Sequence, residues 1–358
     1  MFAFIAFAAV AQAVTKDCFA YKCSSHLARD ECLKFNEEDQ AYLIKPCKED
    51  KVCNADPVNI PDTATCEDPP SAKGTHLAGE KCSNSDDCWP GVSCQSGKCK
   101  GRSRGGTCTT NMECDVGLYC KAGLCSSQIH IGHTGCLIDG DCVNNAGCDI
   151  NSPTDRDLNV CKEYFKLDDY ETLGSCETEG EVNYLCESLF CINLGEASQC
   201  FPAPVSNHTL PVKCDSDGMC VSSKTGEVNK VFGTSCDCGY NTKGQSYCEL
   251  HPGDAPYRDY AKKIKEWVDS EHSLKCNTEG RFGDNCMKTY WSDEDFNEFV
   301  YREMSALHYQ LLYGSEGCTQ QALLTSYWTS KKALEDEDDD DDDWAHALAA
   351  ALVVLLLQ

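Results

Sequence analysis

Helical periodicity of the apolar positions is confined to one part of this chain, between residues 254 and 330. Asp254 and Pro256 are residue types typical of a helix start. The apolar residues that follow recur at intervals of three and four positions. They are Tyr257, Tyr260, Ala261, Ile264, Trp267 and Val268. We therefore expect an amphipathic helix that begins at Asp254.

A second apolar stripe follows Ser292, which forms a capping box with Asp295. Its positions are Phe296, Phe299, Val300, Met304, Leu307 and Leu311. Gly314 is expected to end this helix, and a third helix is expected over Thr319 to Tyr327. Because an apolar stripe has to be covered by another element, residues 254–330 are predicted to form a small α-helical cap.

Both ends of the chain carry apolar runs of a different kind. Met1 to Val10 is almost unbroken, and Ala11-Gln12-Ala13 supplies a small-x-small cleavage site, so residues 1–13 are predicted to be a signal peptide. Residues 344–358 form a second run, which at ~1.5 Å per residue is shorter than the ~30 Å hydrocarbon core of a bilayer. A short terminal run after a polar spacer is typical of a glycosylphosphatidylinositol (GPI) attachment signal.

Ser330 is the lipid attachment site predicted for that signal, and residues 331–343 are the acidic spacer. The alternative is a short, tilted membrane-spanning anchor. Both interpretations take the protein through the secretory pathway to the cell surface, where it is bound to the membrane through its C-terminal anchor. The nine carboxylates from Glu335 to Asp343 could also collect calcium weakly, but a solvated spacer is favoured.

Between the signal peptide and the cap, the chain offers few large apolar side chains. It has thirty cysteines in 358 residues, and the Cys-x2-Cys spacing typical of zinc sites does not occur in the sequence. The cysteines are therefore predicted to be paired as disulfides in an oxidising compartment. Segments below ~40 residues rarely bury a sufficient core, and a bridge that closes a loop of about 15 residues contributes on the order of 3 kcal/mol instead.

One group of four cysteines is repeated with identical spacing. Residues 82–125 are two tandem repeats whose disulfide pairing is left open, with the cysteines Cys82, Cys88, Cys94 and Cys99, then Cys108, Cys114, Cys120 and Cys125. Two glycines per repeat suit hairpin turns, and we expect two short strand pairs in each repeat. Residues 136–161 are a third, divergent copy. Three copies in series predict an array rather than one globule.

A looser similarity relates residues 14–66 to residues 176–248. The cysteine gaps are x4, x8, x14, x5 in the first segment and x4, x8, x13, x5 in the second, which predicts two related cysteine-rich modules. The cap itself holds three cysteines, Cys276, Cys286 and Cys318. Because this number is odd, one of them is expected to bond to the module that contains Cys214 to Cys248.

Charge limits the choice of partner. The formal net charge of −27 argues against nucleic acid and against anionic lipid, so an extracellular protein or a glycan is the expected partner. Asn207, in the only Asn-x-Ser/Thr sequon, is the predicted glycosylation site. A basic segment between the first two repeats is interpreted as an exposed linker, with binding of a sulfated glycan or an acidic protein as the alternative. It consists of Lys98, Lys100, Arg102 and Arg104.

No sequence motif for catalysis, phosphate binding or calcium binding is found, and no catalytic residue, cofactor or metal is predicted. His130 and His133 are interpreted as linker residues rather than metal ligands. Asp139-x-Asp141 and Asp215-x-Asp217 are interpreted as turn formers rather than calcium ligands. Cys236-x-Cys238 is expected to be two cysteines with different partners rather than a redox pair.

The two complete repeats, Cys82-SNSDD-Cys88-WPGVS-Cys94-QSGK-Cys99 and Cys108-TTNME-Cys114-DVGLY-Cys120-KAGL-Cys125, resemble the N-terminal cysteine-rich region of Dickkopf-type secreted proteins. The whole layout also resembles cysteine-rich surface proteins of unicellular eukaryotes. The expected fold is small disulfide-rich modules with short β-hairpins in tandem, followed by a disulfide-stapled helical cap. The expected function is non-enzymatic adhesion, coat formation or ligand binding at a membrane. The alternatives are a Dickkopf-like secreted signalling modulator and an unrecognised extracellular hydrolase.

Overall fold

The computed structural model describes residues 18–48, 51–55, 60–70, 73–176, 183–194, 197–224 and 230–335. These ranges include all thirty cysteines. The predicted signal peptide (1–13) and hydrophobic tail (344–358) lie outside the described residues, as does the acidic spacer beyond Glu335. Tandem disulfide-rich modules with short hairpins precede a helical region, which confirms the predicted fold class.

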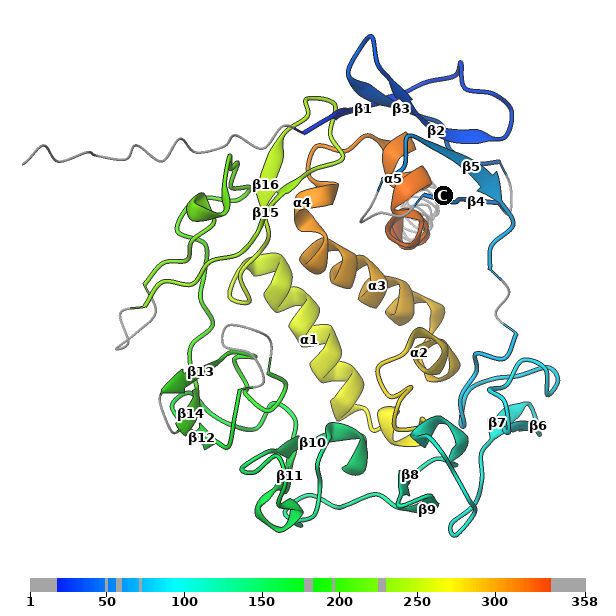
Figure 1. Cartoon of the computed structure of the whole chain (residues 1–358), viewed down its shortest axis with the longest axis vertical. Helices are drawn as coiled ribbons and strands as arrows, with labels where there is room; N and C mark the ends of the chain where they lie inside the picture. The colour runs from blue at the N-terminus through cyan, green and yellow to red at the C-terminus, as the bar shows by residue number, and fades with distance from the viewer. Residues whose placement is uncertain are drawn as a thin grey trace, which may run out of the picture.

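The helices lie at the centre of the molecule, and the small sheets surround them (Figure 1). They are α1 (Ala255–Asp269), α2 (Asp284–Tyr290), α3 (Asp293–Leu307), α4 (Tyr309–Leu312) and α5 (Gly317–Leu323), and residues 325–335 are also helical. The predicted stripes of α1 and α3 are buried in one cluster, which includes Ile264, Trp267 and Phe299. The Trp267 ring is fully buried, and its Nε1 donates a hydrogen bond to the Arg281 carbonyl at 2.6 Å.

Helix starts and ends differ in part from the prediction. The capping box is confirmed, because Ser292 Oγ accepts a hydrogen bond from Asp295 N at 3.0 Å. The second stripe predicts one helix through Leu311, but α3 ends at Leu307, which is 40% exposed, and His308 separates it from α4. The short helix α2 is not predicted by the sequence, because its seven residues are too few to display a periodic stripe.

The N-terminal module is a five-stranded sheet in the order β1-β3-β2-β5-β4. Its strands are β1 (Ala20–Cys23), β2 (Glu31–Asn36), β3 (Ala41–Ile44), β4 (Val52–Cys53) and β5 (Thr63–Glu67), and β1 pairs parallel to β3. Leu33 and Ile44 are fully buried in a cluster shared with Leu324 and Tyr327. The first module of the chain thus packs on its last described helices.

The other modules are built on short hairpins. The pairs are β6 (Ser93–Gln95) with β7 (Lys98–Lys100), β8 (Leu118–Lys121) with β9 (Leu124–Ser127), β10 (Ala146–Asp149) with β11 (Val160–Glu163), and β15 (Cys236–Cys238) with β16 (Ser246–Cys248). A three-stranded sheet joins β12 (Thr172–Leu173), β14 (Ala197–Cys200) and β13 (Cys191–Leu194). Each complete repeat has one strand pair rather than the two expected. Its first half forms only isolated backbone β-bridges, such as the one between Lys81 and Lys98. The four repeat glycines all have positive φ, as their predicted turn positions require.

All the modules share one pattern of disulfide pairing. In each group of four cysteines, the first bonds to the third and the second to the fourth, so the two bridges cross. The first repeat contains Cys82–Cys94 and Cys88–Cys99, and the second contains Cys108–Cys120 and Cys114–Cys125. The same pattern holds for Cys32–Cys53 with Cys47–Cys66, Cys136–Cys148 with Cys142–Cys161, Cys176–Cys191 with Cys186–Cys200, and Cys214–Cys236 with Cys220–Cys248.

The gap similarity between residues 14–66 and 176–248 does not extend to the pairing. Residues 176–248 contain two complete crossed units, 176–200 and 214–248, whereas residues 14–66 contain one such unit and two cysteines with distant partners. Disulfide partners are set by which thiols the fold brings together, and gap lengths alone do not specify this.

Three disulfides lie outside the crossed units, and they correct the predicted attachment of the cap. Cys276 bonds to Cys286 within the cap, and Cys318 of α5 bonds to Cys23 of the N-terminal module, not to the module with Cys214 to Cys248. Cys18 bonds to Cys238, which confirms that Cys236 and Cys238 have different partners. The two long-range bridges join the first module to β15 and to α5.

The three repeats keep small clusters around their own cysteines, whereas the segment that follows the third repeat packs into the core of the cap. Tyr164, Phe165 and Leu189 lie in the same buried cluster as α1 and α3. The chain therefore runs around the helices and returns to its starting point, where the bridges from Cys18 and Cys23 close the circuit (Figure 1).

Candidate functional site

The acidic residues singled out in the repeats serve the fold of each unit. The acid before the second cysteine accepts a hydrogen bond from the backbone N–H of the residue after the first cysteine, in Asp87, Glu113 and Asp141 alike. These backbone N–H groups hold the pKa of Asp87 and of Glu113 below the ordinary value. In the unit 214–248, Met219 Sδ takes the same role and accepts from Asp215 N at 3.5 Å.

A second contact is repeated three residues before the second cysteine. There a side-chain oxygen accepts a hydrogen bond from the backbone N–H of the third cysteine. The acceptors are Ser85, Asn111, Asp139 and Asp217. Asp139 and Asp217 are thus used as turn acceptors, which agrees with their interpretation as turn formers.

The loop around Cys276–Cys286 binds the repeats to the helices. Asn277, which is fully buried, donates its Nδ2 to the carbonyls of Asn111 and Cys114, and its backbone N–H bonds to Ala78 O at 2.9 Å. Asn144 of the third repeat donates in return to Ser273 O and Cys276 O. A Cβ added at Gly79 would lie 2.1 Å from the Lys275 carbonyl, so the first repeat also approaches this loop closely.

The basic segment is engaged within the molecule, rather than being an open linker. Lys98 Nζ bonds to the Tyr290 hydroxyl at 3.0 Å and lies 4.2 Å from the centre of the same ring. Lys100 pairs with Asp115 at 3.0 Å, and Arg102 pairs with Glu113 at 3.4 Å. Three of its four cations thus contact other repeats or the cap.

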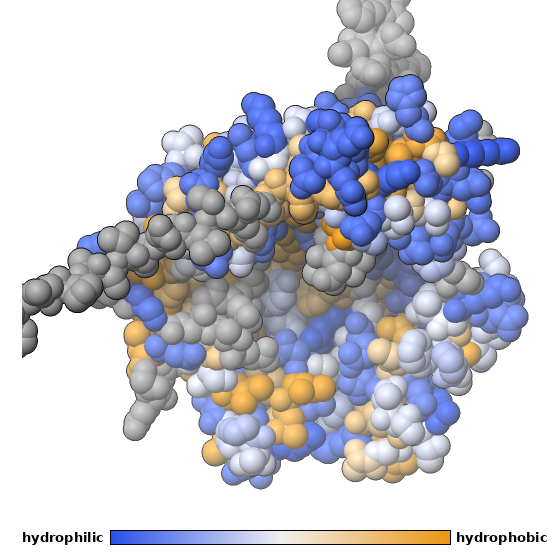
Figure 2. Space-filling model, turned by 45° about the horizontal axis from the view of Figure 1, so that its top comes forward, coloured by the Kyte–Doolittle hydropathy of each residue, from blue (hydrophilic) through white to orange (hydrophobic). Residues whose placement is uncertain are grey.

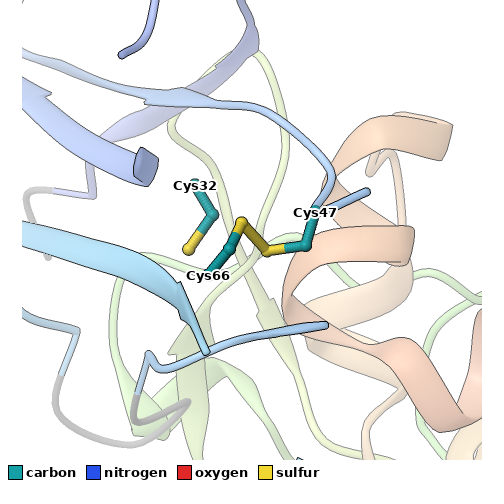
Figure 3. A group of neighbouring side chains, drawn as sticks. All are labelled: Cys32, Cys47 and Cys66. Atoms are coloured by element: carbon teal, nitrogen blue, oxygen red, sulfur yellow. A yellow bond between two sulfur atoms is a disulfide. The ribbon is translucent and has the colours of Figure 1, made fainter. Parts of the chain in front are cut away.

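Groups of three neighbouring sulfur atoms occur in the modules but hold no free thiolate. In Figure 3, Cys32 lies beside the Cys47–Cys66 bridge, and Cys32 itself bonds to Cys53. None of the thirty cysteines, all of which are described, is free. The sulfur clusters are therefore crossed disulfides rather than metal ligands. His130 and His133 are both exposed in the segment before the third repeat.

The two predicted modification sites have contrasting surroundings. Asn207 is exposed and follows Ser206, which forms a backbone β-bridge with Ser222, so the side-chain amide of Asn207 is accessible. Ser330 is 4% exposed within the helical residues 325–335, and its hydroxyl lies 3.5 Å from Asn297 Oδ1. Both modifications remain predictions.

Ser206, His251 and Asp254 lie together at the start of α1 and have the residue types of a hydrolytic triad. The Asp254 carboxylate accepts from Ser206 Oγ at 2.6 Å, Ser206 N at 2.9 Å and His251 N at 2.8 Å. In a catalytic triad the serine donates to the histidine ring instead. Asp254 occupies the N-cap position of α1, as predicted, but its side chain makes these loop contacts and does not cap the helix.

A cleft of about 450 Å³ opens where α1, α3, α4 and α5 meet. Its aromatic lining consists of four tyrosines, Tyr301, Tyr309, Tyr313 and Tyr327. Its polar lining includes Asp259, Arg302, Ser305, Ser315 and Gln320. We call this site the tyrosine cleft. The cleft is not recognisable in the sequence, because its residues come from four separate elements and several of them occupy the polar sides of helices.

The tyrosine rings are fixed by contacts with one another. Tyr301 and Tyr327 are stacked with ring centres 5.3 Å apart and are joined through their hydroxyls. Tyr313 is 41% exposed, and its ring packs edge-on against Tyr247 at 4.9 Å. Burial raises the pKa of Tyr309 and of Tyr327, so both hydroxyls remain protonated.

The long-range bridges stabilise two walls of the tyrosine cleft. Cys318 lies two residues before Gln320 in α5 and is bonded to the N-terminal sheet. Ser315 forms a backbone β-bridge with Asn241. Asn241 lies three residues after Cys238, which is disulfide-bonded to Cys18. One wall is thus cross-linked and the other hydrogen-bonded to elements far away in the sequence, and the shape of the cleft depends on the closed circuit.

Other concave regions are present on the surface. A cleft of about 430 Å³ lies between α1 and the crossed unit 176–200, and one of about 500 Å³ lies between α2, α3 and residues 325–330. Figure 2 shows one face hollowed in its middle, with hydrophilic and hydrophobic side chains both present around the hollow. Among the described residues, no helix combines the length and the apolar composition needed to cross a bilayer.

Comparisons with family models, with curated proteins and with solved structures find no match to this chain. The fifteen disulfides identify it as a cysteine-rich protein of the secretory pathway or the extracellular space.

Proposed function

We propose that this chain is a non-enzymatic, membrane-anchored extracellular binding protein and that the tyrosine cleft is its ligand site. The observation that carries the proposal is the construction of this cleft. Four elements converge on it and its rings are braced. One wall, α5, is cross-linked by a disulfide that spans 295 positions, and Ser315 of another wall pairs with the backbone of Asn241 near Cys238. Concave sites with aromatic walls and a few convergent polar groups are the usual form of small-ligand sites.

The anchored location is supported by the sequence of the two chain ends and is tested on intact cells. Phosphatidylinositol-specific phospholipase should release the protein from cells that express the full-length chain. Retention on the cells would indicate the alternative spanning anchor. Mature protein in the medium with its hydrophobic tail intact would favour the soluble signalling modulator.

Binding is tested with the full-length protein, taken from the cell surface or from the medium and applied to cells that do not produce it. Tyr313→Ala should reduce binding by about tenfold, since truncation of a central aromatic anchor commonly costs ≥ 1 kcal/mol. Tyr170→Ala is the matched control, because Tyr170 is also an exposed tyrosine with an edge-on aromatic partner, Phe201. Equal binding by both variants would exclude the tyrosine cleft as the site. Turnover of an extracellular substrate that one point mutation abolishes would establish the hydrolase instead.

A further inference from the structure

We infer that the ligand of the tyrosine cleft is a neutral saccharide, an inference that rests on the proposed function of this cleft. The first argument is the exposed aromatic surface. Tyr313 is braced by Tyr247 and lies 6.1 Å from Tyr309, yet it keeps 41% of its surface open. A rigid, partly exposed aromatic ring provides a large contact area at low entropic cost, and the C–H face of a sugar ring is an apolar surface that can lie on it.

The second argument is the number of hydroxyl groups that the protein leaves for a ligand. Among the described residues, the hydroxyls of Ser305, Tyr309 and Tyr313 have no hydrogen-bond partner, and all three line the cleft. Gln320 donates its amide to Ser315 at 3.0 Å, which leaves the amide oxygen as an acceptor. Hydroxyls that both donate and accept suit a ligand that is itself rich in hydroxyls.

The third argument is charge. The charged lining residues of the cleft are Asp259 and Arg302, and they pair with each other at 3.5 Å. Arg302 also pairs with Glu298 at 3.5 Å, so two carboxylates neutralise the charge of this guanidinium. No excess positive charge lines the cleft, and the chain as a whole carries −27. An anionic ligand would therefore be repelled, and neutral sugars are favoured over sialylated or sulfated ones.

The test uses the full-length protein and soluble oligosaccharides of glucose, mannose, galactose and N-acetylglucosamine, with sialylated and sulfated counterparts, measured by calorimetry. At least one neutral saccharide should bind. Tyr309→Phe, which removes one hydroxyl and keeps the ring, should weaken this binding about two- to tenfold. Tyr313→Ala should weaken it by about tenfold or more, and Tyr170→Ala should leave it unchanged. Circular dichroism checks that each variant is folded.

The inference is overturned if only charged glycans bind, or if neutral sugars bind equally to wild type, Tyr309→Phe and Tyr313→Ala. Two outcomes of the cell-binding experiment distinguish failure of the saccharide inference from failure of the proposed function. Cell binding that depends on Tyr313 but is not competed by any neutral saccharide would reject the saccharide and keep the tyrosine cleft as the site. Cell binding that Tyr313→Ala leaves unchanged would reject both the saccharide as the ligand and the tyrosine cleft as the site.

Discussion

At the scale of single residues, four of the six crossed units use one side-chain acceptor placed three residues before the second cysteine. Ser85, Asn111, Asp139 and Asp217 differ in chemistry but all present an oxygen to the N–H of the third cysteine. The third cysteine is buried in two of these units, as Cys148 and Cys236, and a buried donor without a partner is costly. The position therefore specifies an acceptor rather than an acid, which is why it was not recognisable as a motif.

The unit 214–248 offers a direct test of this rule. Asp217→Ala should lower the free energy of unfolding by about 1–3 kcal/mol, because Cys236 N would lose its acceptor. Asp217→Asn should restore most of the loss, since Asn111 fills the equivalent position in the second repeat. Asp215→Ala, which removes an exposed carboxylate of the same loop, should change stability by less than about 0.5 kcal/mol. Denaturant unfolding under non-reducing conditions measures all three, and equal losses at 215 and 217 would contradict the rule.

A buried carboxyl group should make stability depend on pH. Glu80 is 2% exposed at the contact between the first repeat and the cap, and burial raises its pKa to about 7. Since this pKa is higher in the folded than in the unfolded chain, Glu80 should cost no stability below about pH 4.5 and an increasing amount as the pH rises to about 7.

Glu80→Gln keeps an acceptor for Leu77 N, which bonds to Glu80 Oε2 at 2.8 Å, and cannot ionise. The variant should match wild type near pH 4.5 and be more stable above pH 7, by on the order of 3 kcal/mol. Thermal unfolding of both proteins across this pH range measures the gap. A gap that stays constant with pH would show that ionisation of Glu80 is not responsible.

At the scale of elements, the sequence predicts most where packing is local. The stripes of α1 and α3 are visible because each helix buries one face, and the hairpin turns are visible because their glycines take positive φ. Helix α2 is too short to show a stripe, and the break at His308 and the four-element tyrosine cleft are not visible because they depend on neighbours distant in the sequence. The six crossed pairings were likewise open, since spacing allows several connectivities.

The loop that precedes α2 should control the stability of the repeats. Asn277→Ala removes donors to two carbonyls of the second repeat, so it should cost about 2–4 kcal/mol. Asn54→Ala, at an exposed asparagine of the N-terminal sheet, is the control. Hydrogen exchange should become faster at the amides of Cys114 and Asp115 in the first variant only. Unchanged protection there would mean that the second repeat is stable without the loop.

At the scale of the whole molecule, two long-range bridges tie the N-terminal module to distant elements, Cys23–Cys318 to α5 and Cys18–Cys238 to β15. In the chain-entropy model, a bridge across about 100 residues contributes about 4.7 kcal/mol, against about 3 kcal/mol for a 15-residue loop. Cys23→Ser with Cys318→Ser should therefore destabilise the protein more than Cys276→Ser with Cys286→Ser, whose bridge spans only 10 positions. Denaturant unfolding compares the two double variants, and the opposite order would show that loop length does not govern the effect.

The position of Cys23 near the beginning of the chain and of its partner Cys318 near the end also sets a schedule for synthesis. At about 5–20 residues per second, the partner emerges some tens of seconds after Cys23. In that interval each crossed unit can form its two disulfides from its own four cysteines. Cys18 and Cys23 remain free thiols until their partners are synthesised, and they can form incorrect disulfides meanwhile. A nascent chain halted after residue 250 should therefore leave Cys23 open to alkylation, and correct assembly of this protein should depend on an isomerase that reopens premature bonds.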